Sequence, residues 1–179
     1  MGCDSQILLA ARLAANAHKG QTRKWGHASD PYILHPMRVA GRVAINPKAT
    51  TDMIAAAWLH DTAEDCGYTE IDMSVNGVNN EVIRMVLELT NPKMPGVPRA
   101  ERKEVTRKRL SAASWGARVI KLEDRIDNIR ETIYDMYTPQ DFVKLYLDES
   151  DALLLCLEGT DDELEGELRE LILRGKQRE

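Results

Sequence analysis

The segment TDMIAAAWLHDTAED, residues 51–65, decides how this chain folds and where its chemistry lies. Apolar residues recur along its first half at the spacing of one helix face. His60 and Asp61 follow this apolar stretch directly, and burying two consecutive ionisable side chains is costly unless they are paired or bound to something. A metal ion removes that cost, so the segment predicts a buried helix that carries metal ligands.

The remaining sequence is also helical in pattern, and no alternating strand pattern competes with it. Only 5% of the residues are aromatic, with a single Phe, so the core must be built from Leu, Ile, Val, Ala and Met. These features predict an all-α, compact fold with residues 1–179 in a single domain. Thr50 or Thr51 can cap the central helix and Gly67 can end it. The expected helices cover residues 4–19, 35–46, 51–65, 80–89, 99–113, 117–134, 139–157 and 161–174.

Charge and composition exclude several classes of protein. The net charge of -5 argues against a protein that wraps nucleic acid or coats an anionic membrane. No apolar run approaches the roughly 20 residues of a membrane span, and the first residues do not form a signal peptide. Cys3, Cys66 and Cys156 are widely spaced, which indicates reduced thiols in a cytoplasmic protein.

Two further residues can complete a metal site with His60 and Asp61. His35 stands directly before Pro36, and Asp124 lies within VIKLEDRIDN, residues 119–128, where the neighbouring apolar residues predict a buried helix. Two imidazoles and two carboxylates suit Mn, Fe, Zn or Mg-like chemistry and leave coordination positions open for water and a phosphate oxygen.

Four ordered blocks together resemble a known family. They are AHKGQTRKWG followed by PYILHP, then AAAWLHDTAED, then LT at 89–90, then VIKLEDRIDN, and they lie between about Ala11 and Arg130. These blocks resemble the signatures of HD-domain hydrolases of the RelA/SpoT type, and the C-terminal helices at 139–174 are matched only loosely. The resemblance implies a helical HD-domain fold and a small, stand-alone hydrolase. Its implied reaction removes the 3′-pyrophosphate from the guanosine alarmones ppGpp and pppGpp.

The resemblance also implies roles for particular residues. It makes His35, His60, Asp61 and Asp124 the ligands of Mn²⁺, although another divalent metal is possible. If the helix continues, Glu64 and Asp65 follow His60 and Asp61 by one turn. A carboxylate at that position can take a proton from water. The family uses the matching pair for hydrolysis, so these two are the expected catalytic residues.

Four residues are expected to bind the nucleotide. Arg23 and Lys24 fall on a cationic loop before His35, and the resemblance makes them contacts of the nucleotide. Asn128 lies one turn after the metal ligand on its helix, and Tyr146 can close the pocket from the next one. Lys93, Arg99 and Arg102 are weaker candidates for holding pyrophosphate, because basic residues flanking a Pro-rich loop are usually just exposed.

Departures from the family pattern leave the substrate open. Glu123 stands where a small Ala is usual, Asp127 stands where His is common, and HASD lengthens the loop before Pro31. We expect these positions to touch the substrate side. The alternatives are an HD phosphohydrolase of another nucleotide (an adenine alarmone, a nucleoside 5′-monophosphate or NADPH) or a catalytically dead nucleotide sensor. The sequence does not fix the oligomeric state.

Overall fold

A computed structural model describes residues 4–23 and 30–177 of the chain. All regular elements in these ranges are helices, and an isolated antiparallel bridge joins Thr22 to Pro31. The all-α prediction is therefore confirmed. The helices are α1 (Asp4–Ala17), α2 (Leu34–Ile45), α3 (Thr51–Leu59), α4 (Thr62–Cys66), α5 (Glu70–Val75), α6 (Asn80–Leu89), α7 (Arg99–Ser111), α8 (Trp115–Tyr134), α9 (Gln140–Leu157) and α10 (Asp162–Lys176).

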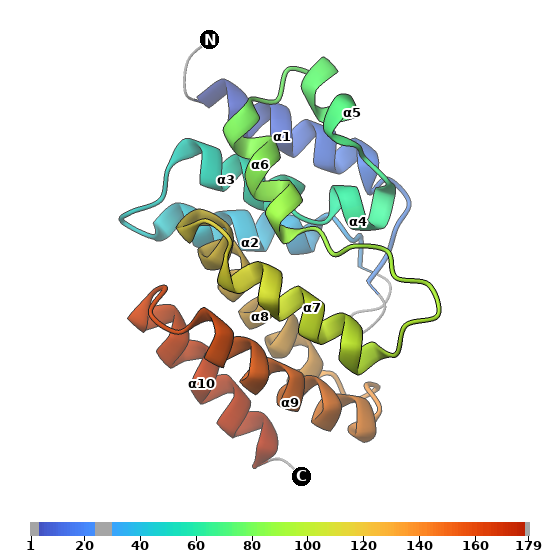
Figure 1. Ribbon diagram of the computed structural model, residues 1–179, viewed down its shortest axis with the longest axis vertical. Helices are drawn as coiled ribbons and strands as arrows, with labels where there is room; N and C mark the ends of the chain where they lie inside the picture. The colour runs from blue at the N-terminus through green and yellow to red at the C-terminus, as the bar shows by residue number, and fades with distance from the viewer. Residues whose placement is uncertain (1–3, 24–29, 178–179) are drawn as a thin grey trace.

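The long helix α8 organises the packing. It contacts α2, α3 and α6 on one side and α7, α9 and α10 on the other, while α1 and α10 lie at opposite ends of the molecule (Figure 1). Ile120, Leu122, Ile126 and Ile129 of α8 are fully buried. The buried hydrophobic residues of the described ranges are Ala, Val, Leu, Ile and Met, as the composition predicts. α8 thus carries its charged residues into the interior of the protein.

The predicted central helix is broken in two, which corrects the sequence prediction. α3 ends at Leu59, and α4 begins at Thr62. Two side chains bond to carbonyls at this junction: His60 Nδ1 lies 2.7 Å from the oxygen of Ala57, and Thr62 Oγ1 donates to that of Leu59 at 2.7 Å. Such side-chain bonds compete with the helical ladder. His60 and Asp61 therefore lie in a turn between two helices, not inside one.

Local signals explain most helix ends. Thr50 caps α3 by accepting a hydrogen bond from the backbone N–H of Met53 at 3.2 Å, and Gly67 ends α4 with a left-handed φ of 73°. α2 and α3, which are consecutive in the chain, pack together. One helix escaped prediction: α5 starts from a capping box in which Thr69 and Asp72 exchange side-chain and backbone hydrogen bonds.

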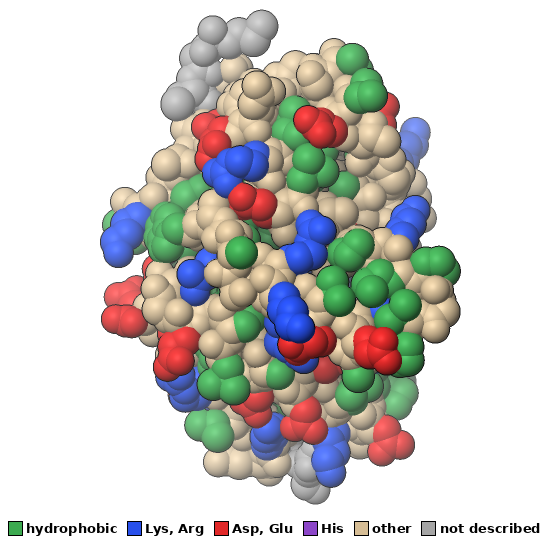
Figure 2. Space-filling model, viewed as in Figure 1, with side chains coloured by type: hydrophobic (Ala, Val, Ile, Leu, Met, Phe, Trp, Pro, Cys, Tyr) green, Lys and Arg blue, Asp and Glu red, His purple; other side chains and the backbone are tan. Residues whose placement is uncertain are grey.

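The exposed face over α6, α7, α9 and α10 mixes both signs of charge. Lys and Arg side chains are interspersed with Asp and Glu across it (Figure 2). Within the described ranges, no helix combines the length and apolar character that a membrane crossing requires.

Two helical glycines give opposite predictions for stability. A Cβ added to Gly166 of α10 meets no atom within 4 Å, so Gly166→Ala should raise the free energy of unfolding by about 0.5–1 kcal/mol through helix propensity. A Cβ at Gly116 of α8 would lie 2.9 Å from Met85 Sδ and 3.0 Å from Met53 Cγ. This crowding should cancel the gain from helix propensity, so Gly116→Ala should not raise the free energy of unfolding. Urea unfolding of both variants checks this, and equal stabilisation by both would contradict the packing around Gly116.

Candidate metal centre

Two buried histidine rings meet where α2 approaches the turn between α3 and α4. The Nε2 atoms of His35 and His60 lie 3.2 Å apart. The Nδ1 atom of His60 faces the carbonyl oxygen of Ala57 at 2.7 Å, and that of His35 faces Asp127 Oδ2 at 2.6 Å. A carbonyl and a carboxylate only accept, so both Nδ1 atoms donate. In the neutral rings, both Nε2 lone pairs then point at the same small volume, where a cation satisfies both.

Two carboxylates close the same volume. Asp61 Oδ2 lies 3.1 Å from His60 Nε2 and 3.5 Å from His35 Nε2. Asp124 Oδ1 lies 3.2 Å from His35 Nε2 and 3.8 Å from the ring of His60. One ligand atom each of His35, His60 and Asp61 lies within 4.8 Å of the others. The donors are two nitrogens and two carboxylate oxygens, a set that fits a divalent cation.

Protons and a metal compete for this site. Burial lowers the pKa of His35, but hydrogen bonds with Asp124 and Asp127 outweigh it and raise that pKa to about 9. Burial also opposes the upward shift of the pKa of His60, which the charge of Asp61 causes. In the other direction, burial disfavours charge on Asp124, yet Lys121 and the two histidines hold its pKa well below the usual range. Without a metal, the carboxylates therefore favour the protonated form of both rings.

Three side chains fix the orientation of the carboxylates. The hydroxyl of Tyr32 donates to Asp61 Oδ2 at 2.7 Å. Lys121 Nζ donates to Asp124 Oδ2 at 2.6 Å, and Asn128 Nδ2 donates to Asp124 Oδ1 at 2.5 Å. Tyr32 and Lys121 were not among the residues predicted for the site. The signals were present, since Tyr32 belongs to the block that contains His35 and Lys121 lies one turn before Asp124 on a buried helix.

A chain of ion pairs, which we call the α8 relay, supports His35 from behind. Asp127 accepts from His35 and is clamped by Arg38, whose Nε and Nη2 lie 2.7 Å and 2.9 Å from its two oxygens. Arg38 also bonds to Glu131. The other oxygen of Glu131 accepts from Arg23 Nε at 2.8 Å and Nη2 at 2.5 Å. The relay therefore runs from Arg23 through Glu131, Arg38 and Asp127 to His35.

Most of the chain matches one known protein family. Residues 10–142 match the family model described as HD domain. The chain belongs to the HD-domain family.

Relatives of this HD-domain chain extend the match to its full length. It is 34% identical over 178 residues to human guanosine-3′,5′-bis(diphosphate) 3′-pyrophosphohydrolase MESH1, covering 96% of each chain. A protein of Vibrio cholerae named guanosine-3′,5′-bis(diphosphate) 3′-pyrophosphohydrolase is 36% identical over 66% of this chain, but over 17% of its own length.

A solved structure confirms the fold. It is described as a metazoan ortholog of SpoT that hydrolyses ppGpp and plays a role in starvation responses. Its TM-score with this HD-domain chain is 0.84 at 27% identity, over 97% of this chain and 95% of that one. The match confirms the helical HD-domain fold that the sequence blocks predicted.

Three of the four residues expected to bind nucleotide lie on one cavity of about 200 Å³. Arg23, Asn128 and Tyr146 line it together with Tyr32 and Glu131. Arg23 lies over the Tyr32 ring, with 5.2 Å from Cζ to the centroid, and donates to Asn128 Oδ1 at 2.6 Å. Tyr32 and Asn128 also bond to the metal-site carboxylates, so the cavity adjoins the metal centre. The fourth residue, Lys24, lies outside the described residues.

The expected catalytic pair lies on α4, beyond the break. Both carboxylates are exposed, and Glu64 Oε2 accepts from the backbone N of Asn91 at 3.2 Å and from its Nδ2 at 2.9 Å. Desolvation and the neighbouring charge of Asp61 raise the pKa of Asp65. A raised pKa makes a carboxylate a better proton acceptor at neutral pH. Their catalytic role stays a prediction.

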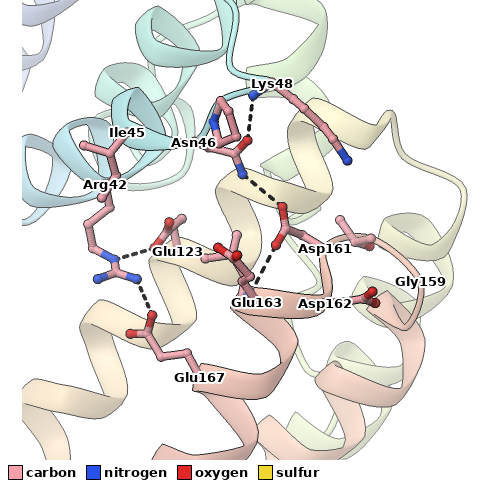
Figure 3. A pocket seen from close by; sticks show the side chains of 13 residues that line it. Arg42, Ile45, Asn46, Lys48, Glu123, Gly159, Asp161, Asp162, Glu163 and Glu167 are labelled. Atoms are coloured by element: carbon pink, nitrogen blue, oxygen red, sulfur yellow. Dashed lines mark hydrogen bonds and ion pairs between the residues drawn. The ribbon is translucent and has the colours of Figure 1, made fainter.

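The departures at Glu123 and Asp127 do not lie where the sequence suggested. Glu123 bonds to Arg42, which also donates to Glu167 of α10 at 2.8 Å (Figure 3). Asp127 bonds to His35 and Arg38, and neither acid lines the cavity that holds Arg23, Asn128 and Tyr146. Neither acid therefore lies with the nucleotide-binding candidates, because successive α8 residues point to different neighbouring helices.

Asp127→Asn should lower the affinity for a divalent metal by roughly 10- to 100-fold, because supporting carboxylates orient a ligating histidine and raise its basicity. Glu123→Gln is the matched control: it neutralises a buried acid of the same helix that contacts Arg42 instead. Isothermal titration with Mn²⁺ measures both. Equal losses in the two variants would contradict the role given to Asp127.

Metal affinity should rise with pH. The pKa of His35 is raised to about 9 from its ordinary value near 6.5, so between these values the metal-free ring holds a proton that a ligand must lose. Each displaced proton should strengthen binding by about tenfold per pH unit in this window. Titrations of Mn²⁺ in buffers of different ionisation enthalpy, from pH 6.5 to 8.5, count the protons. Flat affinity with no proton release would refute the protonated metal-free site.

Proposed function

We propose that this protein is a metal-dependent hydrolase that removes the 3′-pyrophosphate of ppGpp and pppGpp, giving GDP or GTP and pyrophosphate. The observation that carries the proposal is the buried convergence of His35, His60, Asp61 and Asp124 beside a cavity lined by Arg23 and other nucleotide-binding candidates. The full-length similarity to proteins named for this reaction supports the substrate.

The four converging residues would hold the metal, which we propose to be Mn²⁺. A bound divalent cation lowers the pKa of water and neutralises charge on the phosphate under attack. Tyr32, Lys121 and Asn128 keep the two carboxylates aimed at the site. The free thiols of Cys66 and Cys156 fit a cytoplasmic enzyme.

The remaining residues act on water and substrate. Asp65, whose pKa is raised, accepts a proton from the water that attacks the 3′-phosphorus, with Glu64 beside it. The bond between phosphorus and the ribose 3′-oxygen breaks, pyrophosphate leaves with the water oxygen, and the 3′-oxygen takes up a proton. Arg23, Lys24, Asn128 and Tyr146 bind the nucleotide, with the Arg23 guanidinium offering a plane for the base and charge for its phosphates.

Protein loaded with Mn²⁺ should release pyrophosphate from ppGpp. Asp61→Ala should lose both metal and turnover, because it removes a ligand. Glu64→Gln and Asp65→Asn should keep the metal but lower kcat by roughly 100-fold or more, because each removes a carboxylate able to accept a proton. Chromatography of the nucleotide products and calorimetry of metal binding separate these two effects.

Glu70→Gln, an exposed acid of α5, is the control that should leave both readings unchanged. The same protein is offered an adenine alarmone, a nucleoside 5′-monophosphate and NADPH. If the protein releases orthophosphate from the nucleoside 5′-monophosphate or from NADPH, and no pyrophosphate from ppGpp, that compound would replace ppGpp as the proposed substrate. Binding of ppGpp without any turnover would make the protein a nucleotide sensor.

A further inference from the structure

Four of the eight residues that line a small cavity between α7, α8 and α9 are basic. Lys103 and Arg107 reach it from α7, Lys121 and Arg125 from α8, and Glu149 from α9. Its volume is about 20 Å³, which holds one water-sized group. The cavity thus offers several positive charges to a single small atom.

Two lining residues touch the proposed catalytic machinery. Lys121 Nζ lies 2.6 Å from Asp124 Oδ2, and Asn91 Nδ2 lies 2.9 Å from Glu64 Oε2. The cavity therefore lies beside both a metal-ligand carboxylate and a carboxylate proposed to act on water. Any anion in it would be next to the reaction.

The positive charges of this cavity are incompletely neutralised. Glu149 accepts from Arg99 at 2.6 Å and 2.9 Å, and it makes a longer ion pair with Lys103, whose Nζ lies 3.7 Å away. Burial lowers the pKa of Lys103 to about 8, and the nearby charges of Arg125 and Lys121 add to the shift. An anion in the cavity would oppose both effects.

Arg125 provides independent evidence for a missing acceptor. Its Nη1 donates to Ser150 Oγ at 3.0 Å, and its Cζ lies 4.4 Å from the centroid of the Tyr146 ring. The side chain is almost fully buried, yet its Nε has no hydrogen-bond partner among the described residues. Buried charged donors are rarely left unpaired, because the lost solvation is not recovered.

We propose that Lys103, Lys121 and Arg125 form an anion site that takes one oxygen of a phosphate group beside the metal centre. The cavity admits a phosphate oxygen but not a whole phosphate, so the rest of the group lies at its mouth, where the half-buried Lys103 can adjust. The phosphate is either the outer one of the substrate's diphosphate or part of free pyrophosphate. Naming it so rests on the proposed function, whereas the anion site does not.

This assignment differs from the basic residues that the sequence singled out. Arg99 is committed to Glu149, and Lys93 and Arg102 are exposed. The residues of the anion site are instead brought together by the packing of α7 against α9 and α8.

The test titrates inorganic pyrophosphate into the full chain loaded with Mn²⁺, by calorimetry. Lys103→Gln should weaken binding by about tenfold, because it removes a charge-assisted hydrogen bond. Lys108→Gln, on the exposed face of the same helix, is the matched control and should bind like the wild type. Equal affinities of Lys103→Gln and the wild type would overturn the anion site.

A second measurement does not depend on the metal. The pKa of Lys103, followed by NMR of its side-chain nitrogen in metal-free protein, should rise when inorganic phosphate is added, because an anion stabilises the ammonium form. Lys108→Gln, the matched control, should leave this phosphate-dependent rise at Lys103 unchanged. No phosphate-dependent rise at Lys103 would count against the site.

Kinetics with ppGpp separate the anion site from the proposed function. A higher KM together with weaker pyrophosphate inhibition in Lys103→Gln assigns the site to the substrate's outer phosphate, and weaker inhibition alone assigns it to the free product. If the wild type releases pyrophosphate but Lys103→Gln changes neither constant, the anion site is wrong and the function stands. If Lys103-dependent pyrophosphate binding occurs without hydrolysis of ppGpp, the function is wrong and the anion site stands.

Discussion

Two imidazole rings and two carboxylates occupy one buried volume, and much of the structure serves this electrostatic arrangement. Desolvation opposes every charge placed there, and partners must compensate for it. α8 supplies many of these partners from positions buried among apolar residues, including Lys121 and Asp127. Arg38 of α2 donates to Asp127, and Tyr32, in the segment before α2, donates to Asp61. The packing of α2 on α8 therefore also brings oppositely charged side chains of the two helices into contact.

The fold could largely be predicted from the sequence, because helical periodicity and capping residues are local properties. The apolar pattern located α6 and α8 closely, and Gly67 ended α4 as expected. The break at His60 could not be found in this way, because it depends on side-chain bonds to backbone carbonyls inside an apolar run. α5 was missed because its signal is a single capping box over a short, mainly polar segment.

In the candidate site too, local sequence signals were enough to predict some residues, whereas others depend on contacts between distant segments. Residue chemistry and ordered blocks indicated His35, His60, Asp61 and Asp124, which the fold brings together from two helices and a turn. Periodicity gave no direction for Glu123 and Asp127, because α8 is buried around its whole circumference and either residue can face a helix or the substrate. The direction of each side chain is decided by which distant segment it contacts, and a single sequence does not show such contacts.

The α8 relay joins the cavity lined by Arg23, Asn128 and Tyr146 to the candidate metal centre through four consecutive contacts between charged groups. A phosphate or base that draws Arg23 away from Glu131 leaves that carboxylate to Arg38, and so alters the field that His35 feels through Asp127. Occupancy at one end is then energetically coupled to occupancy at the other, and such coupling is reciprocal. If a bound metal raises the affinity for the nucleotide by some factor, a bound nucleotide raises the affinity for the metal by the same factor. The enzyme would then bind its metal most tightly when substrate is present.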